Sequence, residues 1–471
     1  MSRTFLIPGV YEHLADIREY LTDDVCGILL YLTTPESEAR RAAPCDEKFR
    51  QRLFTYASLT KVEQAPLEGD DWAAYDRCLK AVLADARVFY LAMRSYFDTA
   101  LNSTLVIEKV VYNTVRILRA TRPDRLVASS TPHSVEAWIF ARCVEELGLP
   151  VFILERTPIN NRAWFYRGLD AQTVVERADA PPAALTPYTQ SQVREQVESV
   201  AGARDARGYY VSRMDLSSIK GAESNTWWSW RRELPLLFGG SLKGLPIRLA
   251  SIGLKRRLVR SYEKVAVSTL PDGPFVIFFM HYQPERSSLP EGLFYTQQWL
   301  ALRLIAGLLP PGWKLLVREH PSMWLLPLDI TVRPADYYEQ IAALPNTQVS
   351  SMDLDTFELI DRSAVVSTLT GSVGFQALLR QKPAIVFGLP AYKDHPACIT
   401  VRDSGELARA FDAVRDPAFA ARFSPESLER YLRWVEQHSI VADEKETEWL
   451  AVRLKNFREL YRQLFAGQVT L

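Results

Sequence analysis

The sequence predicts an α/β protein built from two layers, each with a parallel sheet. In the second half, three short apolar runs end abruptly in polar residues: 275–280 (FVIFFM), 315–317 (LLV) and 364–367 (AVVS). Continuous apolar runs of this length are typical of strands buried on both faces of a parallel sheet. A separate strand and helix pattern between residues 124 and 154 predicts the layer of the first half.

Length and composition narrow the class of protein. A chain of 471 residues exceeds one typical domain, so we expect two. Equal numbers of basic and acidic residues, 56 each, give no reason to expect a nucleic-acid partner. Five scattered cysteines without a CxxC pair predict neither a zinc site nor a disulfide framework. An N-terminus that turns acidic early and the lack of an apolar run of ~20 residues predict a cytoplasmic protein, or one held at a membrane face.

The first half alternates predicted strands and helices. The strands are expected at 26–32, 54–59, 124–130 and 150–154, and the helices at 10–21, 71–97, 103–120 and 132–147. The last two strands and the helix between them form a βαβ unit of some thirty residues. We therefore predict an N-terminal α/β domain over residues 1–265.

The second half begins after a segment that is hard to interpret. A helix is expected at about 188–200, and residues 241–264 are basic and partly amphipathic. The clearest turn signal is the PDGP sequence at 271–274. It opens a second α/β domain, predicted over 266–440, and a helical pattern over 443–465 follows it.

Polar residues follow each of the three apolar strands. In open α/β sheets, ligands bind beyond the carboxyl ends of the strands, so these residues are expected to meet at one ligand site. They are His281, Gln283 and Glu285, then Arg318, His320 and Pro321, then Thr370, Gly371 and Ser372. A histidine followed by proline can be aimed by the turn at a phosphate, although such pairs also occur in plain turns.

Small and hydroxyl residues occupy the bend after the third strand, in STLTGSVGF (367–375). Such a bend directs free backbone N–H groups and the positive end of the next helix towards an anion. In the simpler interpretation, Thr370 or Ser372 only caps that helix. The segment is not GxxxxGKS or GxGxxG, and it departs from GxSxG at Thr370, which disfavours triphosphate loops, dinucleotide loops and serine hydrolases.

Two acidic features of the sequence are candidates for catalytic or metal-binding roles. Asp353-Leu354-Asp355 has the DxD pattern of some metal-dependent transferases, but Asp355 precedes a helical run and is better explained as its N-cap. No other cluster has metal-ligand spacing, so no metal is expected. Glu155 ends the predicted strand VFIL, from which it could act as an acid or base between the two domains. The alternative is an ion pair with Arg156 or Arg162.

Three tryptophans, Trp227, Trp228 and Trp230, precede the basic segment 241–264. Together they could contact a membrane or a glycolipid, or they could be core aromatics beside a solvated helix face.

The strand-end motifs resemble those of the bacterial capsule-synthesis and surface-carbohydrate family. The residues that carry the resemblance are HYQPE with LPEG, then REHP, then STLTGSVGFQALLRQKPAIVFG, all within 275–395. This family includes the retaining β-Kdo glycosyltransferases, which use CMP-Kdo (activated 3-deoxy-D-manno-oct-2-ulosonic acid). The resemblance implies a GT-B-like fold: two Rossmann-type domains facing a crevice, the donor nucleotide in the C-terminal one, and a final segment, 441–471, that crosses back to the N-terminal domain.

The resemblance also implies roles for particular residues. Gln283-Pro284 and His320-Pro321 correspond to the QP and HP motifs of the family, which places His281, Gln283 and His320 near the CMP, while Ser372 and its neighbours hold the phosphate or cytidine. Arg318 replaces a lysine that relatives often carry, with the same charge. Retaining members use an aspartate nucleophile in the N-terminal domain, for which Asp215 is the nearest candidate.

The predicted function is therefore transfer of Kdo, without metal or cofactor, from CMP-Kdo to a surface polysaccharide or glycolipid, with peripheral inner-membrane contact as an option. Another CMP-activated ulosonic acid, of the sialic type, would fit as well. Two alternatives stay open: a nucleotide-sugar epimerase of the same fold, and a non-catalytic accessory protein of polysaccharide assembly.

Overall fold

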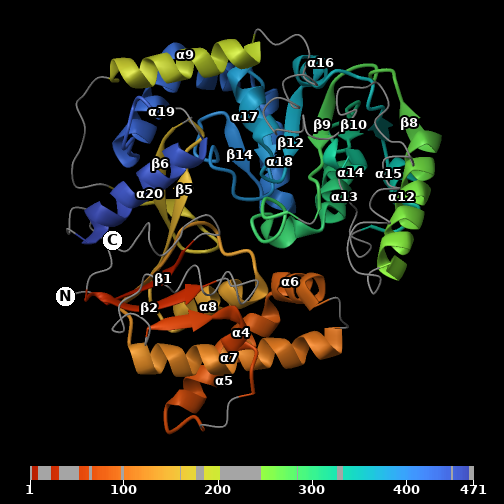
Figure 1. Cartoon of the computed structure of the whole chain (residues 1–471). Helices are drawn as coiled ribbons and strands as arrows, with labels where there is room; N and C mark the ends of the chain where they lie inside the picture. The colour runs from red at the N-terminus through yellow and green to blue at the C-terminus, as the bar shows by residue number, and fades with distance from the viewer. Residues whose placement is uncertain are drawn as a thin grey trace. The chain divides into compact units, whose positions relative to one another are not determined.

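The computed structural model describes residues 3–8, 23–30, 52–62, 66–96, 100–159, 161–176, 185–201, 245–283, 285–325, 333–446 and 449–465. The chain divides into two compact units, and each is described by itself (Figure 1). Unit 1 comprises Met1–Gln192 and Glu429–Leu471, and unit 2 comprises Val193–Leu428.

Unit 1 is built on a seven-stranded sheet with the order β3-β2-β1-β4-β5-β6-β7. The first five strands pair in parallel, and β6 and β7 extend the sheet in antiparallel pairing. The strands are β1 (Thr4–Ile7), β2 (Val25–Leu30), β3 (Leu53–Thr55), β4 (Arg125–Ala128), β5 (Val151–Arg156), β6 (Ala163–Arg167) and β7 (Thr173–Val174). The predicted βαβ unit is present as β4, α8 (Val135–Glu146) and β5.

Among the described residues of unit 1, two elements differ in kind from the sequence prediction, and the helix expected at 10–21 lies outside the described residues. The strand expected at 54–59 becomes β3 followed by a short helix, α4 (Tyr56–Leu59), because Thr55 and Ser58 form a capping box that starts the helix. The long helix expected over 71–97 is two helices, α5 (Asp71–Ala84) and α6 (Ala86–Tyr96). They separate at Asp85, which has extended backbone and binds Arg87 with its carboxylate.

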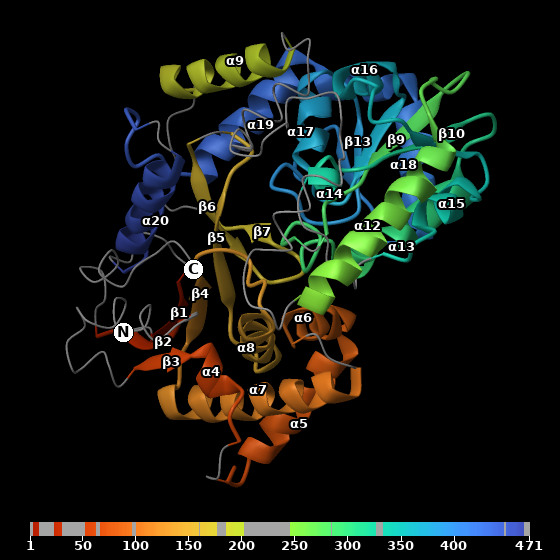
Figure 2. The same cartoon turned by 45° about the vertical axis from the view of Figure 1, so that its right-hand side comes forward.

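The C-terminal helix α20 (Trp449–Phe465) belongs to unit 1, as the fold class predicted. Its residues Phe457, Leu460 and Tyr461 pack against Leu154 of β5 and Phe165 of β6, beside the β5–β6 hairpin visible in Figure 2. The remaining helices of unit 1 are α7 (Ala100–Thr121) and, crossing the boundaries between the units, α9 (Pro187–Ala201) and α19 (Pro425–His438).

Unit 2 has a second seven-stranded sheet, with the order β14-β13-β12-β9-β10-β11-β8 and parallel pairing throughout its described strands. The strands are β8 (Ala266–Val267), β9 (Phe275–Phe279), β10 (Lys314–Arg318), β11 (Thr347–Ser350), β12 (Val365–Thr368), β13 (Ala384–Val386) and β14 (Cys398–Thr400). The helices are α12 (Leu245–Val265), η4 (Leu293–Thr296), α13 (Gln298–Leu308), α14 (Ser322–Leu325), α15 (Tyr337–Ala342), α16 (Thr356–Arg362), α17 (Ser372–Leu379), α18 (Ser404–Arg415) and η5 (Pro417–Phe423). The two sheets, parallel throughout the described strands of unit 2 and from β1 to β5 in unit 1, confirm the predicted α/β fold class.

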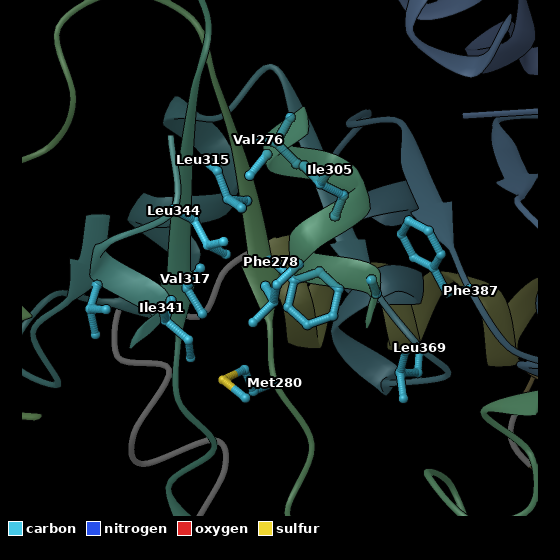
Figure 3. Packing of buried hydrophobic residues seen from close by; sticks show 14 of the residues in the cluster. Val276, Phe278, Met280, Ile305, Leu315, Val317, Ile341, Leu344, Leu369 and Phe387 are labelled. Carbon is cyan, nitrogen blue, oxygen red and sulfur yellow. The ribbon is translucent and has the colours of Figure 1, made fainter. Parts of the chain in front are cut away.

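The central strand of unit 2 is buried on both faces. On one face, Val276 and Phe278 pack against Ile305 of α13 (Figure 3). On the other, Ile277 packs in a second cluster with Ile360 of α16. Burying each such side chain contributes roughly 1.5–3 kcal/mol, which accounts for the apolar runs in the sequence.

The unit boundaries differ from the predicted divisions at residues 265 and 440. Residues 245–265, which the sequence places in the N-terminal domain, form helix α12 of unit 2, because Leu258 and Tyr262 pack in the core beneath α15. The return to unit 1 occurs earlier, at Glu429 within α19. Among the described residues, every helix is too short or too polar to span a bilayer.

Both sheets reverse their strand order at one point. In unit 2 the chain goes from β9 through β10 to β11 and then returns to β12, on the other side of β9. In unit 1 the same reversal lies between β1 and β4. Such switch points are where open α/β sheets bind ligands.

Candidate functional site

His281 joins the two loops of the unit 2 switch point. It follows β9, and its ring Nε2 accepts a hydrogen bond of 3.1 Å from the backbone N–H of Thr370, which follows β12. Its Nδ1 lies 3.3 Å from the hydroxyl of Ser287. Because a backbone N–H can only donate, the neutral ring carries its proton on Nδ1.

Burial keeps the His281 ring neutral. The side chain is 4% exposed, and burial together with the nearby His320 lowers its pKa from 6.5 to about 3. A protonated ring would carry a hydrogen on Nε2 and lose the bond from Thr370. His281 therefore positions the β12–α17 loop, and its predicted place near the CMP stays a prediction.

The same loop is held from two further sides. The Thr370 hydroxyl donates to the carbonyl of Ser287 over 2.5 Å, and the Tyr392 hydroxyl donates to the carbonyl of Gly371 over 2.5 Å. Tyr392 reaches that carbonyl by lying against Gly374, where a Cβ would stand 2.1 Å from the tyrosine oxygen. The position of Gly374 thus requires glycine because of close approach, without unusual backbone angles.

Helix α17 starts at this loop without a side-chain cap. Its N-cap residue is Gly371, no side chain accepts from its first N–H groups, and its first turn contains no acidic residue. The capping role expected for Thr370 or Ser372 is therefore wrong: the Thr370 hydroxyl is held by Ser287, and Ser372 is already the first helical residue. Exposed Ser372 and the adjacent backbone N–H groups form a helix end suited to an anion.

His320 follows β10, the strand on the other side of β9. Its Nδ1 accepts a 3.2 Å hydrogen bond from the N–H of Ser322, so the neutral ring carries its proton on Nε2 and can donate from there. Burial and the positive charge of Arg333 lower the pKa of His320 to about 4. Pro321 forms the turn, with its carbonyl accepting from the N–H of Trp324 over 3.0 Å.

Two other residues predicted to contact the sugar donor, Gln283 and Glu285, have different surroundings. Gln283 is buried and binds the carbonyl of Thr296 and the side chain of Gln298, so it supports the loop after β9. Its neighbour Pro284 lies outside the described residues. Glu285 is exposed and accepts from the Ser287 hydroxyl over 3.0 Å.

Arg318 is buried at the end of β10. Its guanidinium donates to the backbone carbonyls of Ser351, Met352 and Leu354, the last two over 3.0 and 2.8 Å. Burial lowers its pKa to about 10. Arg318 therefore supports the loop after β11, and its predicted contact with the sugar donor stays a prediction.

The DxD segment lies in that same loop. Asp355 accepts from the N–H groups of Phe357 and Glu358 over 2.8 and 2.9 Å, which confirms it as the N-cap of α16. Asp353 accepts from the hydroxyl of Ser351 over 3.0 Å.

Of the two predicted catalytic carboxylates, Glu155 lies in unit 1. Glu155 was expected at the end of a strand, but it lies inside one. Strand β5 continues through Arg156 into an antiparallel hairpin, in which Glu155 pairs with Trp164. Its side chain is buried, 8% exposed, and accepts from the Arg156 N–H over 3.1 Å. Asp215, the Trp227–Trp230 cluster and residues 241–244 lie outside the described residues.

Sequence reasoning missed a buried polar group under the two histidine loops. Glu319, Arg333 and Tyr338 bind one another there, with the Tyr338 hydroxyl donating to Glu319 over 2.5 Å. Glu319 was visible inside the REHP motif, but no spacing rule links it to Arg333, which is fourteen residues away.

One family model matches this part of the chain. Residues 308–404 match the family described as capsule polysaccharide biosynthesis protein. The matched segment contains β10, His320, the β12–α17 loop and Tyr392, and it confirms the resemblance to the capsule-synthesis family for this segment. No curated protein matches the chain.

Several solved structures are similar at low identity. KpsC of Thermosulfurimonas dismutans, a beta Kdo 2,7 transferase, is 11% identical over 62% of this chain and 73% of its own, with a TM-score of 0.27. UDP-GlcNAc 2-epimerase of Methanocaldococcus jannaschii is 12% identical over 93% and 99%, with a TM-score of 0.26. The calicheamicin glycosyltransferase CalG4 is 10% identical over the whole of both chains, with a TM-score of 0.25.

Proposed function

We propose that this protein is a glycosyltransferase that moves Kdo, or a related ulosonic acid, from a CMP-activated donor to a bacterial surface polysaccharide or glycolipid. The observation that carries the proposal is the position of the family match. Residues 308–404 include both His320 and the uncapped start of α17, at the carboxyl ends of two strands that flank β9.

The donor phosphate binds at the start of α17 in this proposal. CMP leaves as a monophosphate, so the site must hold the charge that develops on one phosphate group. The first N–H groups of α17 and the Nε2–H of His320 supply hydrogen-bond donors for it. The proposal requires no metal ion, since backbone and imidazole donors provide the stabilisation.

Sugar transfer is proposed to retain the anomeric configuration in two steps. A carboxylate, for which Asp215 is the candidate, attacks the anomeric carbon while the bond to the CMP oxygen breaks, and the acceptor hydroxyl then displaces the carboxylate. Glu155 exchanges the proton of that hydroxyl. The acceptor is bound by unit 1, with the protein at the cytoplasmic face of the inner membrane.

Donor binding and turnover test the proposal. Calorimetric titration with CMP, with and without EDTA, should give the same affinity in both, and loss of binding in EDTA would contradict the metal-free claim. Incubation with CMP-Kdo, CMP-sialic acid and UDP-GlcNAc should release CMP from one of the first two. Conversion of UDP-GlcNAc would instead indicate an epimerase, and no response to any nucleotide would indicate an accessory protein.

A further inference from the structure

A fully buried ion pair lies beneath the two histidine loops. The side chains of Arg333 and Glu319 are 1% and 0% exposed, and Arg333 Nη1 donates to Glu319 Oε2. Nη1 also donates to the Tyr338 hydroxyl over 2.9 Å, and the guanidinium lies 5.0 Å from the centre of the Tyr337 ring. The guanidinium of Arg333 therefore lies between the start of α15 and the loop after β10.

The pair connects the backbone of both histidines. Arg333 Nη2 donates to the carbonyl of His281 over 3.1 Å. Glu319 Oε1 accepts from the N–H of His320 over 2.5 Å. One end of the pair thus holds the loop after β9, and the other holds the loop after β10.

A need for stability alone does not explain such an arrangement. Two charges taken out of water cost free energy that their attraction recovers only with good geometry, and apolar residues of similar volume often stabilise a core as well or better. A guanidinium, however, has separate N–H groups in a rigid plane and can bind two partners at a fixed spacing. Here those partners are Glu319 and the His281 carbonyl, which belong to different strand-end loops.

We infer that Arg333 is a positioning residue of the donor site, which with Glu319 sets the spacing between the His281 and His320 loops. The inference rests on the proposed function for the identity of the ligand. Arg333 lies outside the strand-end motifs. Its positive charge and the geometry of its guanidinium can be tested separately. A lysine at this position keeps the charge but has a single nitrogen to place.

The test compares Arg333→Lys with Arg380→Lys. Arg380 is also in unit 2, with two nitrogens on Asp361 and one on the carbonyl of Val200. We expect Arg333→Lys to melt near the wild-type temperature and to bind CMP about tenfold more weakly, because one ammonium cannot hold both loops. Hydrogen exchange should become faster in the peptides that contain His281 and His320. Arg380→Lys should change neither.

Wild-type CMP affinity in Arg333→Lys would overturn the inference. Should that variant fail to fold, the double variant Arg333→Gln with Glu319→Gln removes both buried charges together. Weaker CMP binding in the double variant would support the inference, and wild-type CMP affinity would overturn it. In the double variant, NMR titration of the His320 ring should also give a pKa above about 4, since burial still lowers it but the positive charge of Arg333 no longer does. If the wild-type protein binds no CMP, the proposed function fails, and the exchange rates of the two loops alone decide the role of Arg333.

Discussion

The two switch points share a strand topology, but the helices that follow them begin in different ways. In unit 1, α8 begins at Ser134, whose hydroxyl accepts from the N–H of Ala137 over 3.3 Å, and Glu136 lies in its first turn. In unit 2, α17 begins at Gly371 with no side-chain cap and no acidic residue in the first turn. The start of α8 is therefore capped by a side chain of its own, whereas the start of α17 is where the proposed function places the donor phosphate.

The loops before the two helices are nevertheless both held by residues distant in sequence. The hydroxyl of Ser129, after β4, lies 2.6 Å from that of Tyr461 in the C-terminal helix. Thr370, after β12, is held by the ring of His281. Distant residues therefore hold the loop in both units, and the two helix starts differ in the composition of the first helical turn. An acidic residue there stabilises a helix but repels an anion.

The largest effect is expected from a change in unit 1 that should lower turnover without affecting CMP binding in unit 2. Glu155→Gln should lower turnover by ~10²–10⁴-fold, because the amide keeps the shape but cannot carry a proton. CMP affinity should be unchanged. Steady-state kinetics and calorimetry measure the two quantities, and mass spectrometry with donor alone would reveal a trapped sugar adduct.

The matched control for this variant is Glu145→Gln, a partly buried carboxylate of unit 1 that binds Arg142 and the N–H of Leu169. Equal losses of turnover in both variants would indicate a loss of folding, and wild-type turnover in Glu155→Gln would leave Glu155 as a structural residue of the hairpin.

Acid should weaken unit 2 before unit 1. Burial lowers the pKa of His281 to about 3 and that of His395 to about 4. Below pH ~6.5 the unfolded chain binds protons that these folded rings exclude, so the unfolding free energy falls by about 1.4 kcal/mol per pH unit for each ring. This stability is complete above pH ~6.5 and is lost as the pH falls towards the folded pKa values.

Urea unfolding between pH 6.5 and pH 4.5 checks this expectation, with hydrogen exchange in β9 and β4 reporting on each unit. His395→Gln should make the unfolding free energy of unit 2 fall less steeply with decreasing pH, because the unfolded variant binds about one proton fewer. If the unfolding free energy falls equally with pH in both units, His281 and His395 do not cause the acid sensitivity of unit 2.

His320→Ala should weaken CMP binding by roughly ten- to a hundredfold, the effect of ~1.5–3 kcal/mol that a hydrogen bond to a charged group contributes. Calorimetry of this variant is compared with His438→Ala in unit 1, whose ring Nδ1 lies 2.7 Å from the carbonyl of Trp434. Equal CMP affinities in the two variants would remove His320 from the site.

Ser372→Glu tests the helix start directly, because it gives α17 the kind of residue that α8 has at Glu136. The helix should gain ~0.3–1 kcal/mol from the charge at its positive end. CMP affinity should fall on the order of tenfold, since two like charges ~8 Å apart at an effective dielectric constant of ~20 repel by about 2 kcal/mol. Ser372→Gln is the uncharged control. Equal affinities of the Glu and Gln variants would show that the phosphate does not bind at this end.

The smallest effect is expected from Ser134→Ala, the converse change in unit 1. Loss of this cap should cost ~1 kcal/mol of stability. CMP affinity should stay at the wild-type value, since the capped start of α8 is not the donor site. Thermal unfolding and calorimetry provide the two measurements, and weakened CMP binding without loss of stability would contradict the comparison.

Local patterns determined much of this protein. The apolar runs placed β9, β10 and β12 because strands buried on both faces need continuous apolar residues, and Asp355 was identified as a cap from the helical run behind it. The strand ends then placed His281, His320 and Thr370 at one switch point. These inferences succeeded because each depends on residues close together in sequence.

Tertiary structure alone decided what those residues contact. The ring of His281 meets Thr370 across 89 positions, Arg333 meets the His281 carbonyl across 52, and Arg318 meets Leu354 across 36. No spacing rule predicts such pairs, because they form only when neighbouring strands bring their loops together. The hairpin at Glu155 has the same origin: a strand end becomes a strand interior when β6 returns to pair with it.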